Sequence, residues 1–276
     1  YELTTRLVGS EMCIETGYIE NPIEYERRIV RWLDSIKQDA GTLYLLGDIL
    51  DYWYEYRYVV PKGFTRFFGK LAELSDNDID IHWFIGNHDI WIFDYLPHEL
   101  GITIHDGTLI TEIGGKRFFL SHGDNVGKRP MTLRFLRKIF RNRFCQYLYA
   151  AIHPRWTVAF ALRWSAHSRK AGDDYAEYQG EKNEHLVCFA KEFRKTNKID
   201  FFIFGHRHIL LDLALPHQSR IIILGDWIKH PSYAVFDETG LNLFDYIENN
   251  KQKVTGKYAF NIFYTFEVFK QNSAKE

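Results

Sequence analysis

Four short apolar runs in this chain each end at a glycine next to a polar side chain, and this repeated pattern limits the folds that the chain can adopt. The runs read "YLLGD", "WFIGNHD", "FFLSHGD" and "FIFGHRH". A short continuous apolar run bounded by turn residues is typical of a strand that is buried on both faces, as in a parallel sheet. The pattern therefore predicts several buried strands whose carboxyl ends carry polar side chains.

Helical patterns alternate with these strands in the first part of the chain. Residues 22–38 place apolar side chains at helical spacing after Pro22, and residues 62–75 also look helical. The stretches "GTLITEIGGKRFFLSHGD" and "YAVFDETGLNLFDY" read as hairpins, and "IDFFIFGHRH", "LLDLAL" and "RIIILGD" as three more strands. Alternating helices and strands followed by antiparallel strands predict an α/β sandwich, with helices packed over mixed sheets.

The polar residues at the four strand ends are of the types that bind metal ions. They are Asp48, Asn87, His88, His122, His206 and His208. In open α/β sheets the carboxyl ends of the strands converge on one crevice, so residues far apart in sequence meet there. A carboxylate, an amide and several imidazoles suit Mn, Fe or Zn better than Ca or Mg. Each motif alone is more often an ordinary turn, but their occurrence at four strand ends predicts a metal site.

One segment differs from the rest in composition. Between residues 127 and 170 there are eleven Lys or Arg residues and no Asp or Glu, and they alternate with Phe, Trp, Tyr and Leu. We expect a helical insertion at about residues 127–190, within a single domain that spans residues 1–276. Two interpretations of the insertion stay open, a cap over a lipid substrate and an ordinary helix pair with a solvated basic face.

Charge and cysteine content exclude several classes of protein. The formal net charge is −1, and the basic residues gather in one lipophilic segment, which argues against a nucleic-acid-binding role. The three cysteines form no CxxC motif and favour a reduced compartment. No apolar run reaches the roughly 18–20 residues that span a bilayer, and no signal peptide is apparent in a sequence that starts with Tyr1. We therefore expect a cytoplasmic protein.

The motifs "GDILD", "GNHD", "HGD" and "GHRH", in this order, resemble those of the calcineurin-like metallophosphoesterases. The resemblance implies a four-layer αββα sandwich of mixed sheets and two divalent metal ions, which we expect to be Mn²⁺. It implies that Asp48 bridges the two ions, that Asn87, His122 and His206 complete one shell, and that His208 binds the other ion. His88 resembles the histidine that donates a proton or hydrogen bond near the leaving oxygen.

Within that family, "GDILDYW", "HGDN" before a helical insertion, and "LGDW" before "SYAVFD" resemble the UDP-2,3-diacylglucosamine hydrolases of the lipid A pathway. The resemblance implies a nucleotide-linked glycolipid substrate, a cap that holds acyl chains, and a protein that works at the inner face of the inner membrane as a peripheral enzyme. We expect no obligate protein partner. Our candidate substrate contacts are Asp124, Arg129, Ser165, Ser168, Arg169 and Lys170.

The family's first motif, Asp-x-His at the end of the first strand, is absent. Residues 1–21 contain no Asp and no His, and Glu2, Glu11, Glu15 and Glu20 are the carboxylates upstream of the first helix. Three explanations stay open: a truncated or mis-assembled start, a degenerate relative that binds one metal, and a replacement ligand. The second metal site is therefore expected to keep only Asp48 and His208. A phosphoesterase of soluble substrates and a catalytically impaired metal-binding relative remain as alternative functions.

Overall fold

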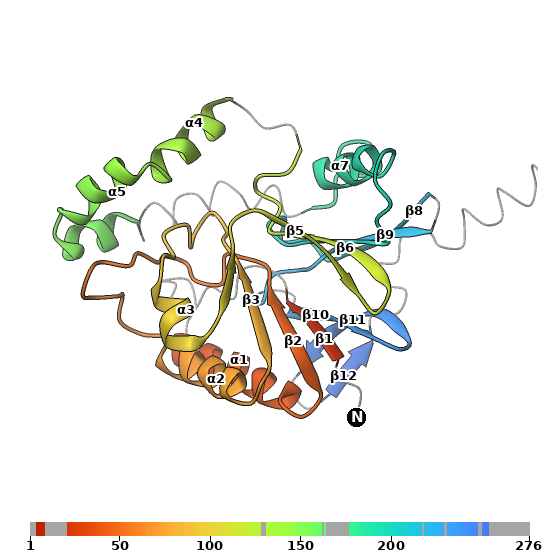
Figure 1. Cartoon of the computed structure of the whole chain (residues 1–276), viewed down its shortest axis with the longest axis horizontal. Coiled ribbons are helices and arrows are strands. Elements are labelled where there is room, and N and C mark those ends of the chain that lie inside the picture. The colour runs from red at the N-terminus through yellow and green to blue at the C-terminus, as the bar shows by residue number, and fades with distance from the viewer. Residues whose placement is uncertain are drawn as a thin grey trace, which may run out of the picture.

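The chain forms two β-sheets that face each other, with helices on both outer sides (Figure 1). The computed structural model describes residues 4–8, 21–127, 131–161, 163, 177–216, 218–228, 231–247 and 250–253. The larger sheet has the strand order β12-β11-β10-β1-β2-β3-β4. Its strands are β1 (Thr4–Val8), β2 (Ala40–Leu45), β3 (Asp80–Phe84), β4 (Thr103–His105), β10 (Ser232–Asp237), β11 (Gly240–Ile247) and β12 (Asn250–Lys253).

The smaller sheet has the order β5-β6-β7-β9-β8. Its strands are β5 (Thr108–Ile113), β6 (Lys116–Ser121), β7 (Phe201–Phe204), β8 (Leu211–Leu215) and β9 (Ser219–Ile223). Strands β5 and β6 form the hairpin predicted around "GG", and β10 and β11 form the hairpin predicted near the other end. Both sheets contain parallel and antiparallel pairs, so the expectation of mixed sheets is confirmed.

Three separate hydrophobic clusters define the layers. Helices α1 (Pro22–Ile36), α2 (Thr65–Asp76) and α3 (Tyr95–Leu100) cover the outer face of the larger sheet, where Trp32 and Phe67 belong to the same buried cluster as Leu43. Next along β2, Tyr44 points the other way into the cluster between the sheets, as the two-residue period of a strand requires. The helix α7 (His185–Phe193) covers the outer face of the smaller sheet. This is the expected αββα sandwich.

The start of α1 illustrates how local sequence sets an element boundary. The Asn21 side chain accepts a hydrogen bond from the Glu24 N–H at 3.2 Å, and Pro22 occupies the first helical turn. Both are favoured there because the first helical N–H groups have no partner within the helix. Buried apolar residues then recur along one face of α1, including Ile29, Trp32 and Leu33.

The helices of the basic segment stand apart from the sandwich. Helices α4 (Met131–Phe140) and α5 (Arg143–Ala150) lie at the upper left of Figure 1, and a further helical stretch covers residues 154–161. No residue of α5 is buried. In contrast, α7 begins within the range predicted for the insertion but contributes Leu186, Val187 and Ala190 to the core of the sandwich.

A row of tyrosines attaches these helices to the larger sheet's loops. The Tyr52 and Tyr149 hydroxyls lie 3.1 Å apart, and the Tyr54 hydroxyl donates to the Gln146 carbonyl at 2.7 Å. The Trp91 indole N–H donates to the carbonyl of Phe140 at 2.9 Å. The segment is therefore held over the strand ends by hydrogen bonds and by aromatic contacts, such as that between the Trp91 and Tyr149 rings at 4.9 Å. None of the helices described is both long and apolar enough to span a membrane.

Candidate metal centre

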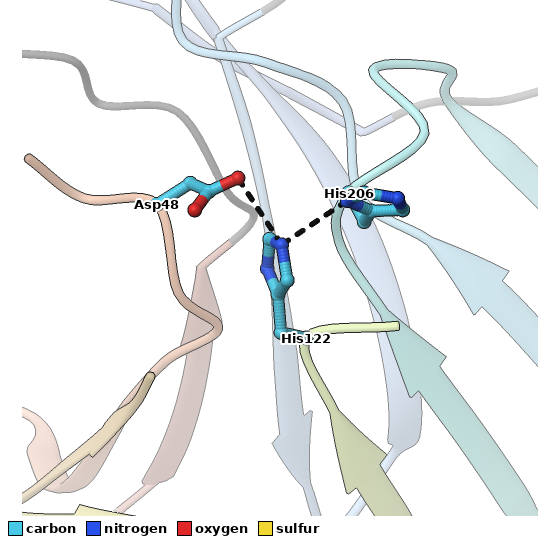
Figure 2. Close-up of side chains that lie close together, drawn as sticks. All are labelled: Asp48, His122 and His206. Atoms are coloured by element: carbon cyan, nitrogen blue, oxygen red, sulfur yellow. Dashed lines mark hydrogen bonds and ion pairs between the residues drawn. The ribbon is translucent and has the colours of Figure 1, made fainter. Parts of the chain in front are cut away.

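Strands from both sheets deliver polar side chains to one place. Strands β1 to β4 run parallel, and so do β6, β7 and β9, so that the carboxyl ends within each group share an edge. Asp48 follows β2, Asn87 follows β3, His122 follows β6, and His206 follows β7. Figure 2 shows Asp48, His122 and His206 pointing toward one another. The strand ends therefore meet as the apolar runs predicted.

One imidazole nitrogen lies at the centre of the cluster. His122 Nε2 is 3.1 Å from Asp48 Oδ2, 3.2 Å from Asn87 Oδ1 and 3.2 Å from His206 Nδ1. Asp48, His122 and His206 each offer one ligand atom, and these three atoms lie within 4.8 Å of one another. Among the described residues, no other group of three or more His, Cys, Asp or Glu side chains comes this close together. Asp48 and His122 are almost completely buried.

The hydrogen bond of His122 Nδ1 determines whether Nε2 carries a proton. His122 Nδ1 lies 2.8 Å from the carbonyl oxygen of Leu46, which can only accept a hydrogen bond, so Nδ1 carries a proton. In the neutral ring Nε2 is then an unprotonated acceptor, and it faces a carboxylate oxygen, an amide oxygen and a second imidazole. A cation among these lone pairs would satisfy all four atoms. Metal-binding histidines are commonly oriented in this way, with a carbonyl that accepts a hydrogen bond from the other ring nitrogen. The residues present therefore fit a divalent metal ion.

The pKa shifts of the residues in the cluster also indicate that a positive charge would be favourable there. Burial by itself would raise the pKa of Asp48, but His122 and His88 hold it well below its usual range. Burial would lower the pKa of His122, but the Asp48 carboxylate raises it. Asp89 is also completely buried, and its burial and the negative charge of Asp48 raise its pKa to about 6.

Two glycines allow the close approach of these loops. A Cβ atom on Gly86 would lie 2.1 Å from Asp48 Oδ1, and one on Gly47 would lie 2.7 Å from His122 Nδ1. Gly47 also has a φ of +83°, in the left-handed region that favours glycine. Asp48 itself adopts a left-handed conformation, with a φ of 51°. The glycines in "GD" and "GN" are therefore required by the packing of the site and not only by the turns.

The buried acids Asp51 and Asp89 support the site, and sequence reasoning did not identify them. Asp89 accepts hydrogen bonds from the backbone N–H groups of Gly86 at 2.7 Å and Ile49 at 3.0 Å, which ties the two motif loops together. Asp51 Oδ1 lies 3.6 Å from Nδ1 of His88. Their signal in the sequence was their position as the last residues of "GDILD" and "GNHD".

His88 contacts the cluster through its backbone. Its N–H donates to Asp48 Oδ1 at 2.7 Å, while its imidazole lies near Asp51. The ring is mostly shielded, with 15% of the side chain exposed. The His88 imidazole is therefore held beside the cluster by an acid and is not one of the groups that converge on His122 Nε2.

The remaining candidates divide into three groups. His208 shares a turn with His206 but is not part of the three-residue group with Asp48. Asp124 is close to the site but forms an ion pair with Arg137 of α4, so its carboxylate already has a cationic partner. The other predicted substrate contacts lie outside the described residues, as do the four upstream glutamates: Arg129, Ser165, Ser168, Arg169, Lys170, Glu2, Glu11, Glu15 and Glu20.

The chain is similar to known proteins over most of its length. The sequence profile of the calcineurin-like phosphoesterase family matches residues 24–210. The UDP-2,3-diacylglucosamine hydrolase of Porphyromonas gingivalis (strain ATCC BAA-308 / W83) is 47% identical over 236 residues, which cover 81% of this chain and 90% of that protein. The protein of that name from Edwardsiella ictaluri (strain 93-146) is 25% identical over 223 residues, covering 78% and 83%. Among solved structures, the phosphoesterase YfcE of E. coli aligns with a TM-score of 0.44 at 13% identity, covering 91% of this chain and 97% of that one.

Proposed function

Because this chain belongs to the calcineurin-like phosphoesterase family, we propose that it is a metal-dependent hydrolase that cleaves UDP-2,3-diacylglucosamine to UMP and 2,3-diacylglucosamine 1-phosphate. The family resemblance noted from the four motifs is thereby confirmed. The observation that carries the substrate assignment is the 47% identity to the Porphyromonas gingivalis UDP-2,3-diacylglucosamine hydrolase over most of both chains. The convergence of four ligand-type atoms near His122 Nε2 supports the metal dependence.

We assign the better supported metal position to Asp48, Asn87, His122 and His206, and a second position to Asp48 and His208. We further propose that the metal is Mn²⁺, which the mixture of imidazole, carboxylate and amide ligands suits. When bound, the ions would neutralise phosphoryl oxygens and lower the pKa of the attacking water. Leu46 and Asp89 would keep the ligands oriented, the first through Nδ1 of His122 and the second through the backbone of Gly86 and Ile49.

His88 is proposed to act on the leaving oxygen. Its backbone N–H is committed to Asp48, and its imidazole is held beside Asp51, so the ring is oriented without being a member of the three-residue group. A histidine beside a carboxylate can hold a proton at the ring nitrogen that faces the substrate and deliver it to the departing group. In this proposal Asp51 is a positioning residue, because it orients the His88 ring.

The helices of the basic segment are proposed to form the cap over the substrate. Large apolar side chains on their described residues are unusually exposed, including Phe144 at 68%, Trp156 at 69% and Phe160 at 61%. Basic residues such as Arg143 and Arg155 alternate with them. Apolar side chains would contact acyl chains, and cationic ones would contact the diphosphate and anionic headgroups. This composition supports peripheral association with the cytoplasmic face of the inner membrane, where a diacylated substrate would lie.

The release of UMP tests the proposal directly. Purified protein with Mn²⁺ is expected to release UMP from UDP-2,3-diacylglucosamine, and an Asp48→Asn variant is expected to lose that activity because the carboxylate shared by both metal positions is removed. Hydrolysis of bis-p-nitrophenyl phosphate without UMP release would favour a phosphoesterase of soluble substrates. The absence of the first Asp-x-His motif favours a second candidate, a metal-binding relative with impaired catalysis, and failure to turn over either substrate would support it.

A further inference from the structure

The turn that carries His206 and His208 is held from behind by a buried ion pair. Arg207, between the two histidines, contacts Glu184 with both ends of its guanidinium group: Nε is 3.0 Å from Oε1, and Nη2 is 3.1 Å from Oε2. The side chain of Glu184 is 1% exposed and that of Arg207 is 10% exposed. A planar guanidinium bound at two points by a carboxylate fixes orientation as well as distance.

Glu184 is itself attached to a rigid element. Its backbone N–H donates to the Gly180 carbonyl at 2.9 Å, and the residue immediately precedes α7. Helix α7 is anchored in the core of the sandwich by completely buried side chains, including Leu186 and Val187. The Glu184 carboxylate therefore has a fixed position relative to the smaller sheet, and its ion pair can hold the His206–His208 turn in place.

The backbone of the turn needs such support. His206 has a φ of 64° and His208 a φ of 53°, so two non-glycine residues adopt the left-handed conformation within three positions. Each such residue is disfavoured relative to the right-handed region, because its Cβ lies too close to the following carbonyl oxygen. Strained conformations of this kind persist where the surrounding contacts specify them. Within the turn, the Arg207 N–H donates to the Gly205 carbonyl at 2.7 Å, and the Gly205 N–H donates to the His122 carbonyl at 3.0 Å.

We propose that Glu184 is a positioning residue that acts through Arg207 to hold the His206–His208 turn in the conformation that presents His206 to the metal centre. This inference rests on the proposed role of His206 as a ligand. Glu184 has no place in the four family motifs and lies far from them in the sequence. Arg207 also donates to the Glu177 carbonyl at 3.3 Å, so the same guanidinium contacts the chain just before α7.

Metal affinity of the full chain, measured by titration calorimetry with Mn²⁺, tests the proposal. In Glu184→Gln the side-chain shape is kept but the charge is lost, and the affinity is expected to fall about 10- to 100-fold, the usual effect of losing a group that orients a ligand. Arg207→Lys keeps the positive charge opposite Glu184 but loses the two-point contact, and a fall of the same kind is expected. If Glu184→Gln does not fold, Arg207→Lys can still be measured. It keeps a cation opposite Glu184 and therefore leaves no unpaired buried charge.

The matched control is Asp212→Asn. Asp212 of β8 binds Arg220 of β9 through the same pairing of a carboxylate with a guanidinium, with Nε 2.6 Å from Oδ1, but it lies on the edge strand of the smaller sheet. Its substitution is expected to lower the melting temperature while leaving the Mn²⁺ affinity unchanged to about twofold, because its partner Arg220 lies on β9 and not in the turn.

The outcomes separate this inference from the proposed function. If the native chain binds no Mn²⁺, the metal assignment itself fails, and the inference fails with it. If the native chain binds Mn²⁺ and a folded Glu184 or Arg207 variant binds it equally well, the positioning role is wrong while the metal centre stands. If Asp212→Asn weakens binding as much as Glu184→Gln, general loosening explains the loss, and the specific role of Glu184 is also wrong.

Discussion

At the scale of single residues, one hydrogen bond determines which nitrogen of the His122 ring is unprotonated. The Leu46 carbonyl accepts from Nδ1, so the lone pair of the neutral ring lies on Nε2, where Asp48, Asn87 and His206 converge. The first prediction concerns this atom. His122→Ala should weaken Mn²⁺ binding on the order of 100-fold or more, beyond the loss expected for an orienting group.

Titration calorimetry measures that effect. His98→Ala is the control, because His98 is an exposed histidine of the short helix α3. A His122→Ala protein that binds Mn²⁺ as tightly as the native chain would show that the metal, if bound at all, lies elsewhere.

The second residue-scale prediction concerns Gly86. A methyl group at Gly86 would come within 2.1 Å of Asp48 Oδ1 and 2.4 Å of the Asp48 backbone nitrogen. Gly86→Ala should therefore lower the free energy of unfolding by about 3 kcal/mol, the upper end of the usual cost of overpacking. Gly69→Ala is the control, because a methyl group in the interior of α2 meets nothing within 4 Å. It should instead stabilise the protein by about 0.5–1 kcal/mol. Urea denaturation of both variants measures the difference.

At the scale of elements, ion pairs connect helices α1 and α2 on the outer face of the larger sheet. Glu73 of α2 accepts hydrogen bonds from Lys37 at the end of α1 and from Lys70, and Lys70 also donates to Asp34 of α1 at 2.7 Å. The Lys37 and Lys70 ammonium groups lower the pKa of Glu73 to about 2. The pairing therefore stabilises the folded state only where Glu73 is ionised.

This leads to a pH-dependent prediction. Because the folded-state pKa of Glu73 lies below the value in the unfolded chain, its contribution to stability is complete above about pH 4.5 and is lost as the pH falls toward about 2. The melting temperatures of the native protein and Glu73→Gln should differ at pH 6, less so in 1 M salt because these side chains are partly exposed, and should converge toward pH 2. Glu99→Gln, at an exposed position of α3, is the control. A difference independent of pH would contradict this origin.

At the scale of the whole molecule, the exposed aromatic surface of the basic segment is what distinguishes this chain from a bare αββα sandwich. If it contacts acyl chains, the variant with Phe144→Ser, Trp156→Ser and Phe160→Ser should turn over the diacylated substrate on the order of tenfold or more slowly, since burying one large apolar side chain is worth roughly 1.5–3 kcal/mol. Hydrolysis of bis-p-nitrophenyl phosphate should be unchanged. A Tyr58→Ser, Val59→Ser protein, altered at exposed apolar positions of a different loop, serves as the control. Equal losses on both substrates would favour an ordinary structural helix pair.

The last prediction concerns the missing first motif. Strand β1 lies parallel to β2, whose carboxyl end carries Asp48, so a motif at the end of β1 would reach the same edge of the sheet. We expect the present chain to bind close to one Mn²⁺ and to hydrolyse phosphodiesters slowly. Replacing residues 1–20 with a strand that ends in Asp-x-His should add a second ion and raise the rate on the order of 10³-fold, the loss typical when one electrostatic element of a site is removed. Two ions and the same rate in the unmodified chain would point to a replacement ligand.

Much of the architecture could be predicted from local patterns. The strands before "GD", "GNHD", "HGD" and "GHRH" are continuous apolar runs closed by turn residues, and both hairpins have glycine at or beside the turn, so each carries its own signal. The elements that the sequence did not predict lack such a local signal. Strand β4 has three residues, helix α3 has six and contains Pro97, and the β1 sequence "TTRLV" mixes polar and apolar residues. Their structure depends on neighbours in the sheet rather than on propensity.

The sequence by itself determined which residue types stand at the strand ends, because the period of buried strands and the turn residues that close them are local properties. It did not reveal that Asp51, Asp89 and Glu184 are buried acids, since a charged side chain has the same local signal on a surface as in a core. Convergence of the strand ends was expected, but only the tertiary structure decided that His122 Nε2 is the atom around which they meet, that Asp124 pairs with Arg137, and that Arg207 turns away to Glu184. These contacts join residues far apart in the chain, and the packing of two sheets and α7 brings them within bonding distance, which no periodicity within one segment encodes.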